Sequence, residues 1–177
     1  MKKIIITYGL IVGAIIAISV SLTLALGADS EHLAGLEWLG YAIMIIAFSV
    51  IFVAIKGHRD RELGGVINFG TAFGVGIGIT VVASLIYVVA WEINLSVTNY
   101  AFMEQYTASL VEVKEASGAS EKELAEYRAE MDLMTERYRN PLFRLPITFL
   151  EIFPVGLLIT LVSAAVLRNS RVLPAAR

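Results

Sequence analysis

Four long apolar blocks constrain the fold of this chain more than any other feature. They cover residues 4–26, 36–55, 66–91 and 145–167; the first and third are uncharged, the second is uncharged from Trp38 onward, and the fourth contains only Glu151. About 20 helical residues rise about 30 Å, which matches the hydrocarbon thickness of a bilayer. The sequence therefore predicts an all-α, polytopic membrane protein in which residues 1–177 form one membrane domain with four transmembrane helices.

The composition agrees with this prediction, because 57% of the residues are hydrophobic and only 17% are charged. Soluble domains have about 45–50% apolar and about 25% charged residues. Lys2 and Lys3 precede the first block, and residues 25–27 offer a cleavage site, so a signal peptide is the alternative for this block. The apolar region of a signal peptide has only about 7–15 residues. We therefore predict that the first block is retained as a span.

The basic residues predict the orientation, because loops on the cytoplasmic side are enriched in Lys and Arg. The linker at residues 27–37 has neither, and Arg137, Arg139 and Arg144 precede the fourth block. If the chain crosses the membrane four times, the start of the first block, the end of the second and the end of the fourth lie on one side. Each of these ends has a basic cluster: Lys2 and Lys3; Lys56, Arg59 and Arg61; and Arg168, Arg171 and Arg177. These three clusters outweigh the single opposing one, so we predict that both termini are cytoplasmic.

The polar segment between the third and fourth blocks predicts two amphipathic helices. Ser120 followed by Glu123 is a capping-box pattern, and Asn140-Pro141 ends the second helix. We predict an extracytoplasmic helical hairpin at about residues 97–140; alternatively, each helix continues a membrane span outward and packs against the other. Each half has an apolar stripe with the spacing of a helix, and the stripes include Tyr100, Met103, Tyr106, Leu110, Val113, Leu124, Tyr127, Met131, Met134 and Tyr138.

Small residues recur at every fourth position of the first and third blocks. Such rows let membrane helices approach closely. They are explained either by packing between the first and third spans, which we favour, or by a homodimer face. Residues 74–78 also resemble a dinucleotide-binding motif, but that motif needs a preceding strand and a polar turn, which a lipid-length helix lacks. The candidate packing residues are Gly9, Gly13, Gly70, Gly74 and Gly78.

Glu151 is the most informative single residue, because an acidic group at the centre of a span costs about 2.5–3.5 kcal/mol on insertion scales. Counting helical rise from the predicted outer surface places Tyr41, Ser84 and Tyr87 at a similar depth. The four residues form a candidate intramembrane polar cluster. Its functional interpretation is binding of a proton or cation; its structural interpretation, which we favour, is a hydrogen-bonded tie between spans.

No pattern in the chain supports catalysis, a cofactor or a metal site. The chain has no Cys, and His32 and His58 are predicted to be loop residues on opposite sides of the membrane. The net charge of −2 gives no indication of a nucleic-acid partner. We therefore expect no enzyme activity, and as partners the lipid bilayer and either another protein or a second copy of the chain.

Three functional hypotheses remain. The favoured one is a non-enzymatic accessory or interaction protein whose outer hairpin engages a partner through its Met- and Tyr-bearing stripe. The alternative is a small oligomeric transporter or channel that uses Glu151. The third, an enzyme that acts on lipid, lacks the clustered carboxylates or histidines that it would need at the interface.

An ordered set of landmarks also gives the chain a family resemblance. The Gly64-Gly65 pair and the Glu-x-x-Pro-x-Gly pattern at residues 151–156 are the most specific when taken together. Further landmarks are Gly40-Tyr41, residues 52–56, Arg59-Asp60, residues 66–73, residues 84–87, Trp91, Tyr138 and Asn140-Pro141. In these features the chain resembles, over essentially its whole length, the bacterial membrane family catalogued as domain of unknown function 4199. The resemblance implies a four-span inner-membrane protein of a Gram-negative bacterium, and it implies no reaction.

Overall fold

The computed structural model describes residues 1–25 and 33–174, and within them the chain forms six α-helices and no strand. The helices are α1 (Lys2–Ala25), α2 (Leu33–Glu62), α3 (Phe69–Val97), α4 (Phe102–Ala116), α5 (Glu121–Tyr138) and α6 (Pro141–Leu167). Four of them, α1, α2, α3 and α6, are long and apolar enough to cross a membrane. The predictions of an all-α chain and of four candidate spans are therefore confirmed. His32 and most of the linker at residues 27–37 lie outside the described residues, as does most of the candidate cleavage site.

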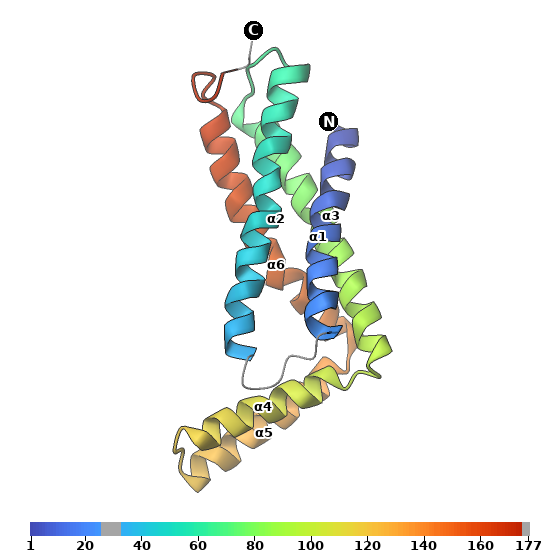
Figure 1. Ribbon diagram of the computed structural model, residues 1–177, viewed down its shortest axis with the longest axis vertical. Coiled ribbons are helices and arrows are strands. Elements are labelled where there is room, and N and C mark those ends of the chain that lie inside the picture. The colour runs from blue at the N-terminus through green and yellow to red at the C-terminus, as the bar shows by residue number, and fades with distance from the viewer. Residues whose placement is uncertain (26–32, 175–177) are drawn as a thin grey trace.

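The four long helices stand side by side as a bundle, with the start of α1 and the end of α6 towards the same end (Figure 1). Helix α1 packs mainly against α3, α3 also packs against α6, and α2 packs against α6. The short helices α4 and α5 lie at the opposite end (Figure 1). This arrangement follows from the chain order, because each long helix returns the chain to the other end of the bundle.

Apolar side chains cover the outside of the bundle as well as its core. Val12, Phe48 and Ile79 are fully buried in the interior, whereas Ile46 and Leu158 are 69% and 62% exposed. Water-soluble monomers rarely expose large contiguous apolar patches. The outward-facing side chains therefore suit a lipid environment.

All four long helices extend beyond the apolar blocks at one end or both, α6 beginning at Pro141 and α1 at Lys2. Helix α2 continues to Glu62 through the polar residues 56–62, where the sequence predicted a linker, and α3 continues past Trp91 to Val97. At its start, α3 begins at Phe69, where the side chain of Asn68 accepts a hydrogen bond from the backbone N–H of Thr71 at 2.8 Å. The apolar blocks indicate which residues suit contact with lipid. The helices are longer than these blocks, because backbone hydrogen bonding continues into the polar residues that follow.

Helices α4 and α5 pack against each other and form what we call the α4–α5 pair. They run antiparallel (Figure 1) and meet through the hydroxyl groups of Thr107 and Thr135, which lie 3.2 Å apart. The turn between them contains Gly118 with a φ of 81°, a conformation that glycine adopts without strain. The predicted capping box of Ser120 and Glu123 is confirmed at the start of α5.

Candidate functional site

A cavity of about 710 Å³ lies where the bundle meets the α4–α5 pair. All six helices contribute to its lining, and most of the lining is apolar. Small-molecule sites in proteins have this character: volumes of about 300–1,000 Å³, apolar walls and a few convergent polar groups. The cavity is therefore the candidate binding site of the chain.

Three of the four residues in the predicted polar cluster line this cavity. Glu151 on α6, Tyr87 on α3 and Tyr41 on α2 all contribute to its wall, and the phenol of Tyr87 interacts with the carboxyl group of Glu151. Ser84 is fully buried but does not line the cavity, and its Oγ has no hydrogen-bond partner within the described part of the chain. The structure therefore brings Glu151, Tyr87 and Tyr41 around one space, whereas Ser84 lies in the packed interior one turn before Tyr87.

Aromatic side chains form a continuous row along the cavity wall. Tyr87 and Trp91 stack with ring centroids 6.4 Å apart, Trp91 meets Phe102 edge-on at 4.9 Å, and Phe102 stacks on Tyr106 at 5.9 Å. These four residues, which we call the aromatic row, all line the cavity. The row crosses from α3 to α4 and so joins the bundle to the α4–α5 pair.

Tyr138 at the end of α5 is a further polar contact between the α4–α5 pair and the bundle. Its hydroxyl oxygen accepts a hydrogen bond from Nε1 of Trp91 at 2.6 Å. Burial raises the pKa of the Tyr138 phenol above its ordinary value, so the hydroxyl group stays protonated at neutral pH. Tyr138 also lines the cavity. The hydrogen bond between Trp91 and Tyr138 thus joins α3 to α5 at the wall of the cavity.

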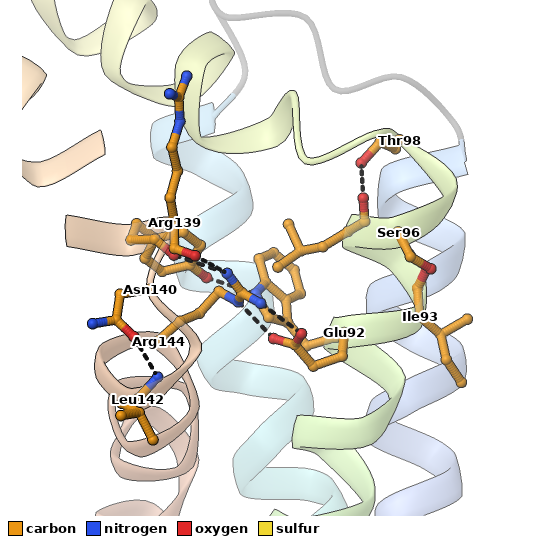
Figure 2. Close-up of polar contacts among 11 residues, drawn as sticks. Glu92, Ile93, Ser96, Thr98, Arg139, Asn140, Leu142 and Arg144 are labelled. Atoms are coloured by element: carbon orange, nitrogen blue, oxygen red, sulfur yellow. Dashed lines mark hydrogen bonds and ion pairs between the residues drawn. The ribbon is translucent and has the colours of Figure 1, made fainter. Parts of the chain in front are cut away.

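Arg144 makes a second set of contacts near the end of α5, including a pair with Glu92 (Figure 2). Its Nε and Nη2 atoms donate to the two carboxylate oxygens of Glu92 at 2.6 and 2.7 Å, and Nη1 donates to the backbone carbonyl of Tyr138 at 2.9 Å. The guanidinium group also lies over the ring of Tyr100, 5.1 Å from its centroid. We call this set of contacts the Arg144 junction. It joins the last part of α3, the end of α5 and the start of α6, and so holds the α4–α5 pair against the end of the bundle where the cavity lies.

The start of α6 depends on local sequence. Pro141 occupies the first helical turn, and the side chain of Asn140 accepts a hydrogen bond from the backbone N–H of Leu142 at 3.0 Å. Proline suits this position because its missing N–H would be unpaired there in any case. Figure 2 shows the Asn140 cap beside Arg144. The cap fixes the first turn of α6, from which Arg144 reaches Glu92.

One comparison with known proteins identifies a family. The chain matches the model of a family described as a protein of unknown function, DUF4199, over residues 7–169. The chain belongs to the DUF4199 family. The resemblance inferred from the sequence is therefore confirmed. No curated protein and no solved structure matches the chain.

Two of the landmarks of this DUF4199 chain have clear physical roles. Gly64 and Gly65 have φ values of 65° and 89° in the turn between α2 and α3, where other residues would be strained. Gly156 lies against α3, because a Cβ atom there would approach Cγ2 of Thr80 to 2.5 Å. Glycine at position 156 therefore permits the close packing of α3 and α6.

The predicted packing glycines divide into two groups. Gly9 and Gly13 on α1 face Val82 and Ile86 on α3, where an added Cβ would lie within 2.6 and 2.7 Å of those side chains. Gly78 on α3 faces Ile5 on α1 at 2.8 Å in the same sense. These three glycines lie between the first and third spans. Gly70 and Gly74, by contrast, face no neighbouring helix in the described protomer.

The basic segment at the end of α2 contains an arginine whose structural role was not predicted from the sequence. Arg59 is fully buried, and its guanidinium group donates to the backbone carbonyls of Val172 at 2.9 Å and Leu173 at 2.5 Å while pairing with Asp60 at 2.7 Å. It is therefore not available to lipid headgroups. The prediction that His58 is a loop residue is wrong, because His58 lies within α2 and is only 4% exposed.

Sequence reasoning did not identify Glu92 and Phe102 as residues of the site, and it did not identify the structural role of Arg144. A signal was present in two of them: Glu92 directly follows the third apolar block and Arg144 directly precedes the fourth. Opposite charges at two adjacent block ends, predicted to lie on one side of the membrane, indicate a pair. Within the described residues, no group of three or more His, Cys, Asp or Glu side chains is placed to hold a metal ion.

Proposed function

We propose that this protein is a multi-pass protein of the bacterial inner membrane, with both termini in the cytoplasm and the α4–α5 pair as an extracytoplasmic hairpin. The basic residues near the termini and at the end of α2 support this orientation. Arg144 pairs with Glu92 and Arg139 with Glu104, at 2.6 and 2.7 Å, but Lys56 and Arg59 on the favoured side pair with Asp60 in the same way. The ion pairs therefore leave the comparison of the basic clusters unchanged, because acidic residues contribute little to this rule.

We further propose that the protein acts without enzymatic chemistry, as an accessory protein that binds an amphipathic molecule in the cavity. The observation that carries this proposal is the cavity itself: about 710 Å³ of space with an apolar wall, one carboxyl group and several phenol and hydroxyl groups. Its position, between the spans and the outer helices, suits a molecule with an apolar body and one polar end. Such a molecule has access to both the lipid phase and the interface.

The apolar stripes of the outer helices give less support to a protein partner. Met103 and Met131, one from each stripe, are only 5% and 8% exposed, so they are used inside the protomer. Val113 at 63% and Met134 at 40% remain accessible. The cavity therefore has a stronger claim than the stripes as the place where this protein interacts with another molecule.

Tryptophan fluorescence tests this proposal, because the chain has only two tryptophans. Trp38 is 78% exposed and does not line the cavity, so Trp38→Phe leaves Trp91 in the cavity wall as the single reporter. In phosphatidylcholine nanodiscs, a decanol carrying a terminal bromine is expected to quench Trp91 saturably. Quenching that rises only in proportion to the probe dissolved in the bilayer contradicts the proposal.

Two glycines supply the matched variants for this experiment. Gly40 lines the cavity and Gly74 does not, and an added Cβ meets nothing within 4 Å at either position. Gly40→Phe therefore fills cavity space without a clash at Cβ, and we expect it to abolish the saturable quenching. Gly74→Phe makes the same chemical change elsewhere and should leave the quenching intact. Equal effects of the two substitutions refute the assignment of the cavity.

The second candidate is a small oligomeric transporter or channel, favoured by the position of Glu151 on a membrane-length helix with its side chain open to the cavity. Four spans are few for a monomeric carrier, so this function requires a homo-oligomer. Proteoliposomes with the purified protein then show a proton or cation flux that Glu151→Gln abolishes. No such flux leaves binding as the function.

A further inference from the structure

The described residues that line the cavity carry negative charge and no positive charge. Glu151 is the single charged residue among the described residues that line it, and neither Lys, Arg nor His occurs in that lining. A carboxylate in a mostly apolar site is costly unless it is hydrogen-bonded or paired with a positive charge. Tyr87 supplies one polar partner from the protein. No positive charge in the described lining pairs with Glu151, so a cationic occupant would supply the partner that the protein does not.

The aromatic row gives the same preference by a different physical route. Aromatic faces attract cations through the ring quadrupole, and sites for quaternary ammonium groups are built from several such faces. Tyr87, Trp91, Phe102 and Tyr106 are in successive ring contact along the wall, with centroid separations of 4.9 to 6.4 Å. The first member of the row is also the residue that interacts with Glu151. The carboxylate thus lies at one end of the aromatic row.

We propose that the ligand of this cavity is a lipophilic amine, an apolar body carrying one positively charged ammonium group, held between Glu151 and the aromatic row. This proposal rests on the proposed function, because it specifies the ligand class of the same cavity. The ammonium group contacts the carboxylate and the aromatic faces, and the apolar body occupies the remaining space along α1 and α2, which contribute Ile16, Val20 and Met44.

The same geometry disfavours fatty acids and phospholipids. A carboxylate or phosphate group in the cavity would meet Glu151 without any basic side chain in the described lining. Arg144 is the basic residue of the nearby junction, but it does not line the cavity, and its donors are directed at Glu92 and at the backbone carbonyl of Tyr138. The occupant is therefore an amine without an anionic group.

Three probes with the same brominated ten-carbon chain separate these possibilities. One carries a trimethylammonium group, one a hydroxyl group and one a sulfate group. Each is titrated into the Trp38→Phe protein in phosphatidylcholine nanodiscs, and the quenching of Trp91 is expressed against the bilayer concentration of the probe, measured in protein-free nanodiscs. We expect the ammonium probe to bind about tenfold or more tightly than either of the others.

Two substitutions locate the charge preference. Glu151→Gln is expected to weaken the ammonium probe about tenfold and to leave the hydroxyl probe unchanged, because only the cation loses a charged partner. Glu130→Gln removes one negative charge from an exposed position of α5 outside the cavity, and should change neither probe. If Glu151→Gln does not fold, the ranking of the three probes on the otherwise unchanged protein still decides the question.

Several results overturn the inference. Equal binding of the three probes or tighter binding of the sulfate probe shows that the site does not select an ammonium group, and no effect of Glu151→Gln shows that Glu151 does not hold it. If the hydroxyl probe still quenches saturably and Gly40→Phe still removes its quenching, the proposed function stands while this inference fails. Inclusion of phosphatidylethanolamine in the nanodiscs adds one more outcome: competition with the ammonium probe identifies a membrane phospholipid as the occupant and refutes an amine without phosphate.

Discussion

Replacing Arg144 and Glu92 with glutamine, singly and together, measures how strongly the Arg144 junction holds the α4–α5 pair to the bundle. The side chain of Arg144 is only 3% exposed and that of Glu92 is 27% exposed. Two charge-assisted hydrogen bonds join them, and each such bond contributes about 1.5–3 kcal/mol. The two bonds share one pair of groups and Glu92 retains contact with solvent, so their energies do not add fully. We expect a coupling energy of about 2–3 kcal/mol.

The pair formed by Arg139 and Glu104 is the matched control. Its N–O distance of 2.7 Å is similar, but the two side chains are 71% and 57% exposed. Exposed ion pairs contribute about 0–1 kcal/mol, because water screens the charges and both side chains lose rotamer freedom. The same glutamine substitutions at these two positions are therefore expected to show weak coupling.

Reversible unfolding in mixed detergent micelles supplies the free energy of unfolding for each single and double variant, and a double-mutant cycle extracts the coupling energy of each pair. The chain has no Cys, so a cysteine introduced on α4 and another on α2 also accept spin labels that report the distance between the pair and the bundle. We expect this distance to broaden in the Arg144→Gln variant. A coupling energy for Arg144 and Glu92 no larger than that of the exposed control refutes the role of the junction.

Three further predictions concern single positions. Arg59→Gln is expected to lower the free energy of unfolding by about 2–4 kcal/mol and to expose the C-terminal segment to limited proteolysis, because a buried network of donors is lost; an unchanged proteolysis pattern contradicts this. Gly9→Leu forces α1 away from α3 and should cost at least about 1–3 kcal/mol in the same unfolding assay, whereas Gly74→Ala is expected to be neutral or stabilising by up to about 1 kcal/mol. The hydrogen bonds from Ser120 lower the pKa of the Glu123 carboxyl group below its ordinary value. The stabilising contribution of Glu123 is therefore present above the unfolded-state pKa and lost as the pH falls through the folded-state pKa. Ser120→Ala removes the hydrogen bond from the hydroxyl group but keeps the one from the backbone N–H, so it should weaken this pH dependence of the unfolding free energy.

Local features of the sequence predicted the parts of the fold that depend on local interactions. The capping box of Ser120 and Glu123 and the end of α5 before Asn140-Pro141 involve residues within three or four positions of each other, whereas α6 begins at Pro141, four residues before the predicted fourth block. Lipid-length apolar blocks likewise predicted four candidate spans, because the bilayer sets their minimum length. The helix ends were less predictable. Helix α2 continues to Glu62 because hydrogen bonding within a helix does not require an apolar side chain.

The candidate site was predictable only in part. Counting residues from the predicted outer surface placed Tyr41 and Tyr87 at a depth similar to that of Glu151. This works in spans of either direction, because every α-helix rises about 1.5 Å per residue. The contribution of Phe102 to the aromatic row was not predictable, because it depends on the turn after α3. There Asn99 and Tyr100 have φ values of 50° and 60°, a left-handed conformation that tyrosine rarely adopts. This turn redirects the chain and brings α4 against Trp91.

The pairing of Arg144 with Glu92 shows a limit of counting basic residues alone. In the sequence, Arg144 opposed the orientation given by the other clusters. In the structure its charge is balanced by a carboxylate 52 positions earlier in the chain, and such a pair arises only when α3 and α6 lie side by side. A count of basic residues along the sequence does not contain tertiary contacts of this kind.

Photoaffinity labelling tests the central claim, that the cavity binds an amphipathic molecule, most directly. A ten-carbon alcohol with a terminal diazirine is irradiated with the protein in nanodiscs, and the labelled residues are identified by mass spectrometry. The account predicts labels on cavity residues such as Met44, Met103 and Tyr106, which disappear in the Gly40→Phe variant and persist in Gly74→Phe. Labels confined to outward-facing residues such as Ile46 and Leu158, unchanged by Gly40→Phe, contradict it.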